Sequence, residues 1–136
     1  MTASDRSFSV AETDRLPRAF GFWSPVVVAE PGRHVFLSGM TARDQSGEVV
    51  GVGDYEAQTR QVCENLKAAV EAAGGTIADI ATVTVYVLDV SAFDLITRVR
   101  REYFPSPPPA STMVQVSRLL DEKCLIEITA TAVIRG

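Results

Sequence analysis

The sequence has few of the residues on which metal chemistry usually depends. It contains one histidine, His34, and two cysteines, Cys63 and Cys124, which are far apart and form no CxxC pair. A zinc site normally needs three or four such ligands at short spacings. We therefore expect no metal and no other cofactor. Cys63 lies on the apolar side of a predicted helix, where a core residue is favoured over a reactive thiol.

Long apolar runs and a strong excess of one charge are also lacking. No run approaches the roughly 18 apolar residues that span a bilayer, and the first 15 residues are polar, unlike a secretory or transit peptide. The formal net charge is −4, and the basic residues are scattered except for Arg98, Arg100 and Arg101. Nucleic-acid binders usually have a basic face. We expect a cytoplasmic protein that binds neither membranes nor nucleic acid.

What the chain does have is the composition of one globular domain. Its 136 residues are 46% hydrophobic and 22% charged, without low-complexity segments, and a chain of this length has room for one hydrophobic core. Residues 1–15 show no periodicity and are expected to form a loose arm. Residues 16–136 then form a single domain.

Periodicity of the apolar residues predicts an α+β fold. Residues 55–73 have a helical apolar stripe between a possible N-cap at Asp54 and a C-terminal Gly74. A second helix follows Ser91 and ends at Pro105. Alternation predicts strands over 34–39, 81–89, 112–117 and 124–133, with the valines of 49–52 as a short hairpin partner. The order β(β)αβαββ is a two-layer sandwich with both helices on one sheet face.

Several segments, taken in order, resemble the RidA/YjgF family. They are FLSG (36–39), QTRQVCENLKAAVEAAG (58–74), TVYVLD (84–89), Phe93, YF (103–104), PPAS (108–111) and IEI (126–128). The resemblance covers about residues 20–134. It implies a chorismate-mutase-like fold, a homotrimer with a central barrel, and clefts between subunits that bind small molecules. It also implies cofactor-independent hydrolysis of reactive enamines and imines, such as 2-aminoacrylate, by a glutamate and a carboxylate-binding arginine.

The family's glutamate corresponds to Glu127. It stands between Ile126 and Ile128, which point to the opposite face of the predicted strand. Burying a carboxylate costs several kcal/mol unless it is paired, and a carboxylate beside substrate can accept and return a proton. Glu127 is thus the predicted catalytic residue, and the alternative is a strand residue that faces solvent.

The family's arginine, which follows a Pro-Ala pair, is replaced by Ser111. A serine supplies neither the charge nor the paired hydrogen bonds of a guanidinium. Arg118 matches a family arginine of structural appearance and is not an obvious substitute. The resemblance therefore predicts a substrate without an α-carboxylate.

Other predicted binding residues follow from the same comparison. Three cleft positions that differ from the family are Trp23, Thr97 and Met113, whereas Ser24, Ser38 and Gly39 are retained, and Ser111 and Thr112 lie at the rim after a proline-rich loop. Trp23 is either a lid over a planar or cationic ligand or an interface packing residue. Ser38 is either a ligand contact or a turn residue. The loop PSPPPAS either holds Ser111 and Thr112 in place at the rim of the cleft or is only a rigid connection between two elements.

Three functions compete on these residues. The leading one is an enzyme that adds water to an imine, enamine or carbinolamine, or removes water during ring closure, in a biosynthetic pathway. The alternative is a catalytically silent trimer that binds a ligand or a protein. Ribonuclease activity is the third, but the sequence lacks a basic groove and a histidine pair. Retention of Glu127 favours the enzyme.

Overall fold

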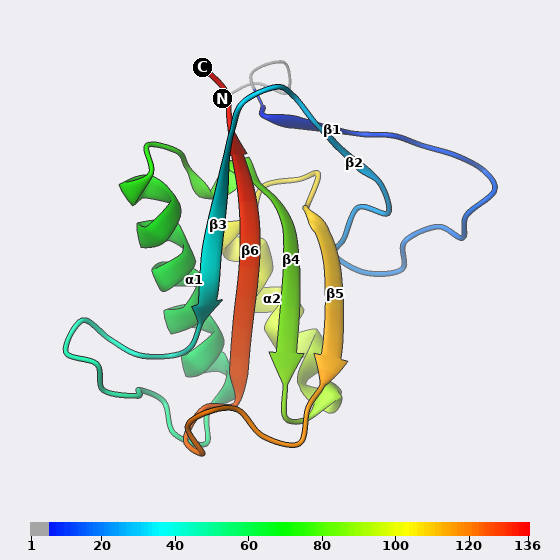
Figure 1. Cartoon of the computed structure of the whole chain (residues 1–136). Helices are drawn as coiled ribbons and strands as arrows, with labels where there is room; N and C mark the ends of the chain where they lie inside the picture. Colours follow the sequence, from blue (N-terminus) through cyan, green and yellow to red (C-terminus); the bar gives the residue numbers. More distant parts are fainter. Residues whose placement is uncertain (1–5) are drawn as a thin grey trace.

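Two helices cover one face of a four-stranded sheet in this computed structural model, which describes residues 6–136 (Figure 1). The sheet has the order β3-β6-β4-β5, with β5 parallel to β4 and the other pairs antiparallel. The strands are β3 (Arg33–Met40), β4 (Ile80–Val87), β5 (Ala110–Gln115) and β6 (Ile126–Ile134), and the helices are α1 (Tyr55–Ala72) and α2 (Phe93–Tyr103). This confirms the predicted α+β two-layer architecture.

The core lies between the sheet and the helices. Val62, Leu66 and Val70 of α1 are fully buried, as their helical spacing predicts. Asp54 caps this helix by accepting a hydrogen bond of 3.0 Å from the backbone N–H of Ala57. The helix stops before Gly74, whose φ of +93° suits a residue without a Cβ.

The strands alternate between the core and an open face. Val83, Val85 and Val87 of β4 are buried under the helices, and so are Ile126 and Ile128 of β6. The opposite face carries threonines, Tyr86 and Phe36, whose side chain is 78% exposed. Figure 1 shows this face in front of both helices, with no helix over it.

The predicted hairpin at residues 49–52 forms only in part, and backbone hydrogen bonds join Val50 N to the Ala42 carbonyl and Asp44 N to the Glu48 carbonyl. Within this loop the structure has only an isolated bridge between Arg43 and Val49. Gly51 and Gly53 have φ values of +63° and +80°, which interrupt an extended strand. The valines were assigned to a strand from their β-propensity, and these two turns override it.

Strand boundaries differ from the predictions by up to two residues, including both ends of β5. At two of the boundaries, side chains take up the backbone groups at the strand end. Strand β4 stops at Val87, since Asp89 accepts from Ser91 N at 2.9 Å and starts the 3-10 turn η3 (Val90–Ala92). Strand β6 starts at Ile126, because Gln58 of α1 donates to the Lys123 carbonyl and accepts from Leu125 N, each at 2.7 Å. Buried backbone groups are thus satisfied from outside the sheet.

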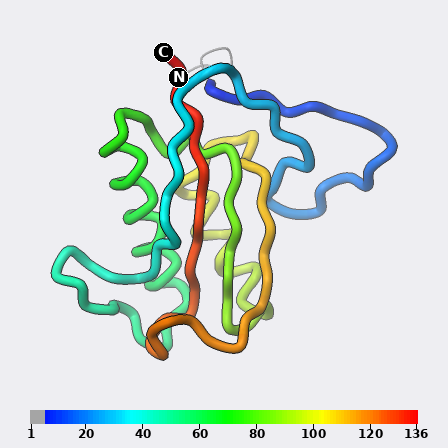
Figure 2. Tube along the Cα trace, viewed as in Figure 1, coloured from blue at the N-terminus to red at the C-terminus, as the bar shows by residue number. Residues whose placement is uncertain are grey.

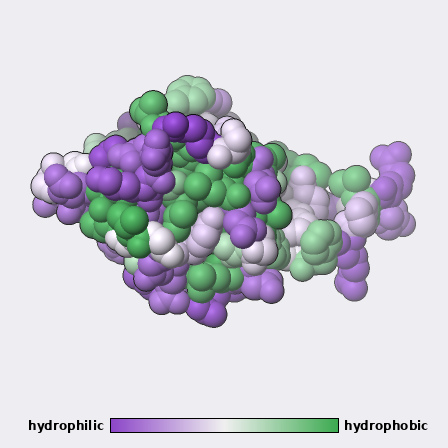
Figure 3. All heavy atoms as spheres, turned by 90° about the horizontal axis from the view of Figure 1, so that it is seen from below, coloured by the Kyte–Doolittle hydropathy of each residue, from purple (hydrophilic) through white to green (hydrophobic). Residues whose placement is uncertain are grey.

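A strand lies within the segment expected to be a loose arm. Residues of β1 (Phe8–Val10) pair with β2 (Val27–Ala29), and Arg6 donates to the carbonyls of Pro107 and Ala78 at 2.9 and 3.2 Å. Residues 1–5 lie outside the described part of the chain. The connection from β1 to β2 extends sideways from the sheet, as Figures 2 and 3 show in two views.

Another short turn, η2 (Ile77–Asp79), leads into β4, where the Asp79 side chain accepts from Thr76 N at 2.8 Å.

The two long helices are joined at their exposed sides by two ion pairs. Arg60 pairs with Glu102 at 3.1 Å and Arg98 pairs with Glu56 at 2.9 Å. Among residues 6–136, no helix is both long and apolar enough to cross a membrane.

Candidate functional site

A pocket of about 400 Å³ lies beside edge strand β5, between α2 and residues 20–23, which precede β2. Its volume lies within the usual range of small-molecule sites, and its wall is mostly apolar with a few polar groups. Four of the predicted binding residues, Trp23, Thr97, Ser111 and Met113, are brought together there. The full lining is Phe20, Phe22, Trp23, Val90, Phe93, Thr97, Arg100, Ser111 and Met113.

Each wall of the pocket follows from local structure. Ser111 and Met113 pair in register with Val83 and Val85, so their side chains point to the helix side of the sheet. Phe93, Thr97 and Arg100 are four and three residues apart on α2 and therefore share one helix face.

The segment of residues 20–24, before β2, supplies the remaining aromatic wall. The rings of Phe20 and Trp23 meet edge to face, with centroids 4.7 Å apart. Trp23 lies against Gly21, where a Cβ would overlap its ring. Ser24 fixes this segment, because its backbone N–H donates to the Pro109 carbonyl at 3.1 Å and its hydroxyl donates to the Pro108 carbonyl. The hydroxyl of Ser24 is thus engaged behind the pocket rather than in its wall.

Arg100 is the residue that the sequence analysis did not single out. Its side chain is only 3% exposed, and its Nη2 donates to the Ser111 hydroxyl at 3.3 Å. Its Nε has no hydrogen-bond partner in the described part of the chain. The guanidinium carbon lies 6.0 and 5.8 Å from the ring centroids of Phe22 and Phe104.

Burial sets the electrostatics of this group. It lowers the pKa of Arg100 to about 10, so the guanidinium remains charged at neutral pH. A sequence signal for it existed: Arg100 is seven residues after Phe93, on the apolar stripe of the second predicted helix. The arginine cluster at 98–101 was instead assessed only as a possible nucleic-acid contact.

Glu127 lies on the other face of the sheet, with Ser38, Gly39 and Thr112. Its neighbour in register on β4 is Tyr86, and its carboxylate rests on Gly39, where a Cβ would overlap Oε2. Gly39 falls at an irregularity in the pairing of β3 with β6, between Leu37 and Met40. Strand β3 thus leaves room for this carboxylate over its backbone.

The sheet itself therefore separates the two groups of predicted site residues within one chain. Glu127 and Thr112 point to the open face, whereas Ser111 and Met113 point to the pocket. A ligand in the pocket of an isolated chain would not reach Glu127. The catalytic and binding roles of these residues stay predictions.

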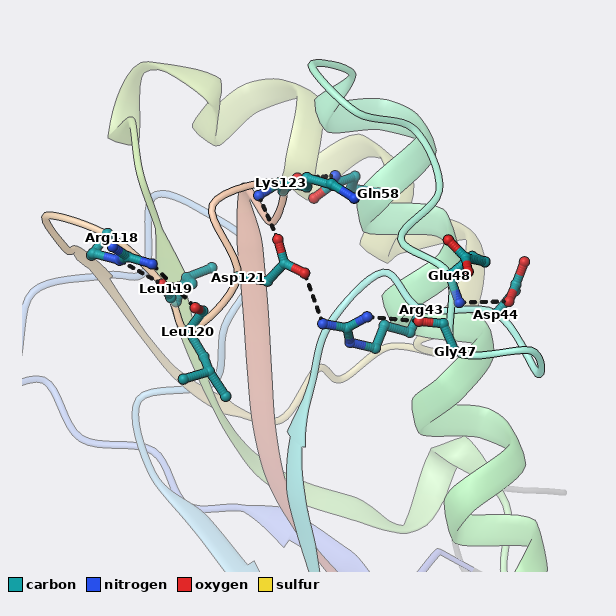
Figure 4. Close-up of polar contacts among 10 residues, drawn as sticks. All are labelled: Arg43, Asp44, Gly47, Glu48, Gln58, Arg118, Leu119, Leu120, Asp121 and Lys123. Carbon is teal, nitrogen blue, oxygen red and sulfur yellow. Dashed lines mark hydrogen bonds and ion pairs between the residues drawn. The ribbon is translucent and has the colours of Figure 1, made fainter.

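Arg118 is not part of either group. Its guanidinium donates to the carbonyls of Leu119 and Leu120, at 3.1 and 3.2 Å, within its own loop (Figure 4). The same figure shows Asp121 of this loop joined to Arg43 by an ion pair of 2.9 Å. These contacts tie loops at one end of the sheet, and they support the structural role expected for Arg118.

Fold and site together define a class: an α+β two-layer protein with a small, mostly apolar ligand pocket beside an edge strand. The family model described as Endoribonuclease L-PSP matches residues 13–134. A RutC family protein of Pyrococcus horikoshii is 42% identical over 121 residues, which cover 88% of this chain and 93% of the relative. Protein DfrA of Myxococcus xanthus is 36% identical over 121 residues, which cover 89% and 92%.

Solved structures agree with these sequence relatives. The Rid-family protein YyfB from Yersinia pestis has a TM-score of 0.85 at 32% identity and covers 94% of this chain and 99% of its own. RidA from an Antarctic Psychrobacter has a TM-score of 0.70 at 33% identity, covering 93% and 99%. The chain belongs to the RidA/YjgF family, which confirms the family predicted from its motifs.

Proposed function

We propose that this protein is a cofactor-independent enzyme that acts on a small imine, enamine or carbinolamine. The single observation that carries the proposal is that one chain has both a preformed apolar pocket and, on the opposite face of its sheet, a carboxylate, Glu127, for which Gly39 leaves room. Membership of a family that includes proteins named RidA supports the same class of chemistry. The physiological direction is either hydrolysis or the reverse loss of water during ring closure.

We further propose that the working form is a homotrimer whose sites lie between subunits. Glu127 and the pocket are on opposite faces of one sheet, so a second copy is needed to bring a carboxylate to the pocket. The open face is suited to an interface, because Phe36 is 78% exposed and Val114 is 38% exposed on it. A closed ring of copies would bury this face and complete each site with a neighbour's residue.

In this proposal Glu127 moves the protons of hydration. It accepts a proton from water as the oxygen attacks the C=N carbon, and returns a proton to the nitrogen to give a carbinolamine. Collapse of the carbinolamine forms the C=O bond, breaks the C–N bond and releases ammonia. The same steps in reverse remove water. Hydroxyls of Ser38, Ser111 and Thr112 orient polar groups, while Trp23 and Met113 shape the pocket.

Two residues bear on whether the substrate carries an α-carboxylate. The prediction of a substrate without an α-carboxylate depends on Ser111 alone, and Arg100 donates a hydrogen bond to that serine. Imines with and without a carboxylate therefore both belong in the test.

The test measures turnover of imines that amine oxidases and amino-acid oxidases generate in solution. The rate of ammonia release reports this turnover. Glu127→Gln keeps the shape of the side chain but cannot accept a proton, so we expect the rate to fall by about 10²-fold or more. Glu71→Gln, at an exposed position of α1, is the matched control and should retain the wild-type rate. An unchanged rate for Glu127→Gln would show that this carboxylate is not the proton carrier.

A further inference from the structure

We propose that Arg100 is the anion-binding residue of this pocket, which therefore selects small organic acids that carry a bulky apolar or aromatic group. The inference rests on the proposed function for the identity of the site, and it names the substrate class of that site. It replaces the prediction, based on Ser111, of a substrate without a carboxylate.

The first argument is the lack of a compensating charge. Arg100 has no ion pair within residues 6–136, whereas its helix neighbour Arg98 pairs with Glu56. Among the described residues, the ionisable group that acts on it is Cys63, and burial raises the pKa of that thiol to about 12, so Cys63 is neutral at pH 7. Buried charges in proteins are normally paired. No described residue of the same chain supplies that partner, and a ligand anion in the pocket would do so. Glu127 of a neighbouring subunit is the alternative partner, and a guanidinium already paired with it would not favour a charged ligand over a neutral one of the same shape.

The second argument is unused hydrogen-bonding capacity. A guanidinium has five N–H donors in a planar fork that matches a carboxylate. In the described part of the chain, Ser111 is the one hydrogen-bond acceptor of Arg100, and its Nε is left without a partner. The Ser111 hydroxyl accepts from Nη2 and so keeps its own proton free to donate to a ligand oxygen. Arginine and serine would then hold the two oxygens of one carboxylate.

The third argument is the character of the rest of the wall. Phe22, Phe93 and Met113 face the same space of about 400 Å³, and Phe20 and Trp23 extend this surface. Such a wall fits an aromatic or branched apolar group, because burial of apolar area contributes to affinity and aromatic edges and faces pack favourably. The ligand is therefore larger than a bare two- or three-carbon acid.

The experiment compares phenylacetate with phenylacetamide, which have the same shape but differ in charge. Trp23 is the sole tryptophan of the chain and lines the pocket, so its fluorescence reports binding without any turnover. The wild type should bind phenylacetate at least about tenfold more tightly than the amide, as expected for charge-assisted hydrogen bonds. Equal affinities for the two probes would overturn the proposal.

Variants assign that preference to one residue. Arg100→Met should bind the two probes within about twofold of one another, and Arg100→Lys should keep part of the preference, since it retains charge but not the planar fork. Arg98→Met, on the solvent side of the same helix, is the matched control and should behave as the wild type. If Arg100→Met does not fold, the wild-type pair of probes and Arg100→Lys still decide.

A different residue could carry the preference, and the test detects this. The exposed Arg101 also contacts Phe22, with its guanidinium carbon 4.6 Å from the ring centroid. Loss of the preference in Arg101→Met, or its survival in Arg100→Met, would refute the assignment. Anion selectivity without imine turnover would support Arg100 and reject the enzyme, whereas turnover without selectivity would reject Arg100 alone.

Discussion

Arg100→Met should make the ligand-free protein more stable. Among residues 6–136 of one chain the side chain is buried with no opposite charge, and methionine fills a similar elongated space without a charge to desolvate. Binding sites often retain groups that cost folding stability. If Arg100 is kept for a ligand, its removal should therefore help the fold while it harms binding.

The magnitude follows from the electrostatics of the folded state. Burial lowers the pKa of Arg100 from its ordinary 12.5 to about 10, which corresponds to about 3 kcal/mol of folding free energy. The contacts with Phe22 and Phe104 and the hydrogen bond to Ser111 offset part of this cost, by about 2 kcal/mol in all. We expect a net gain of about 1 kcal/mol for Arg100→Met near neutral pH.

Urea unfolding of both proteins, at one protein concentration, measures this difference. Its pH dependence has a definite sign. Below about pH 10 the guanidinium carries its proton in the folded and unfolded chains, so the penalty is fully present. Above about pH 10 the folded chain loses that proton first, and the wild type gains stability as the penalty disappears. The advantage of Arg100→Met should therefore shrink toward about pH 11.

A loss of 2 kcal/mol or more in Arg100→Met near neutral pH would refute this reasoning, since a loss of that order indicates a buried group with satisfied partners. Glu127 of a neighbouring subunit would then be the carboxylate that compensates the guanidinium in solution. Arg98→Met is again the control, because its exposed ion pair with Glu56 is worth less than about 1 kcal/mol.

Two further predictions concern the open face of the sheet. Gly39→Ala places a Cβ where Oε2 of Glu127 lies, so the carboxylate must move. Steady-state turnover should fall at least about tenfold, and adding Glu127→Gln to this variant should cause no further loss. Full activity in Gly39→Ala would exclude a role for the carboxylate at this position. Phe36→Asp introduces a charge at a position 78% exposed in the single chain. Sedimentation of this variant should show dissociation of the trimer, because the charge would be buried in the proposed interface. The control Leu120→Asp, at a loop position 94% exposed, should leave the trimer intact. A variant Phe36→Asp that sediments like the wild type would contradict the proposed interface.

The sequence predicted the elements of this fold well because each has a strong local period. The stripe of Val62, Leu66 and Val70 and the alternation of Val83, Val85 and Val87 each identify a buried face without reference to the rest of the chain. The hairpin at residues 49–52 is cut short for a local reason as well, since backbone turns at Gly51 and Gly53 outweigh the β-propensity of valine beyond the bridge at Val49.

The site was less predictable because its residues meet only through tertiary structure. Alternation along β5 indicates that Ser111 and Thr112 face opposite sides, but register with β4 is needed to show which one faces the pocket. Arg100 was not found from the sequence because a comparison with the family's residues, position by position, shows only that a serine replaces the arginine at residue 111. A side chain from a neighbouring helix can reach the same place, and sequence order does not indicate this.

The central claim is that Glu127 of one subunit acts on a ligand in the pocket of another, and subunit mixing tests it most directly. Glu127→Gln and Ser111→Phe, whose ring fills the pocket, should each be inactive alone. After equal random mixing, each mixed trimer joins an intact carboxylate to an intact pocket at one of its three sites. Together with the inactive unmixed trimers this leaves about a quarter of all sites intact, so about a quarter of the wild-type turnover should return. Mixed trimers no more active than the separate variants would contradict the claim.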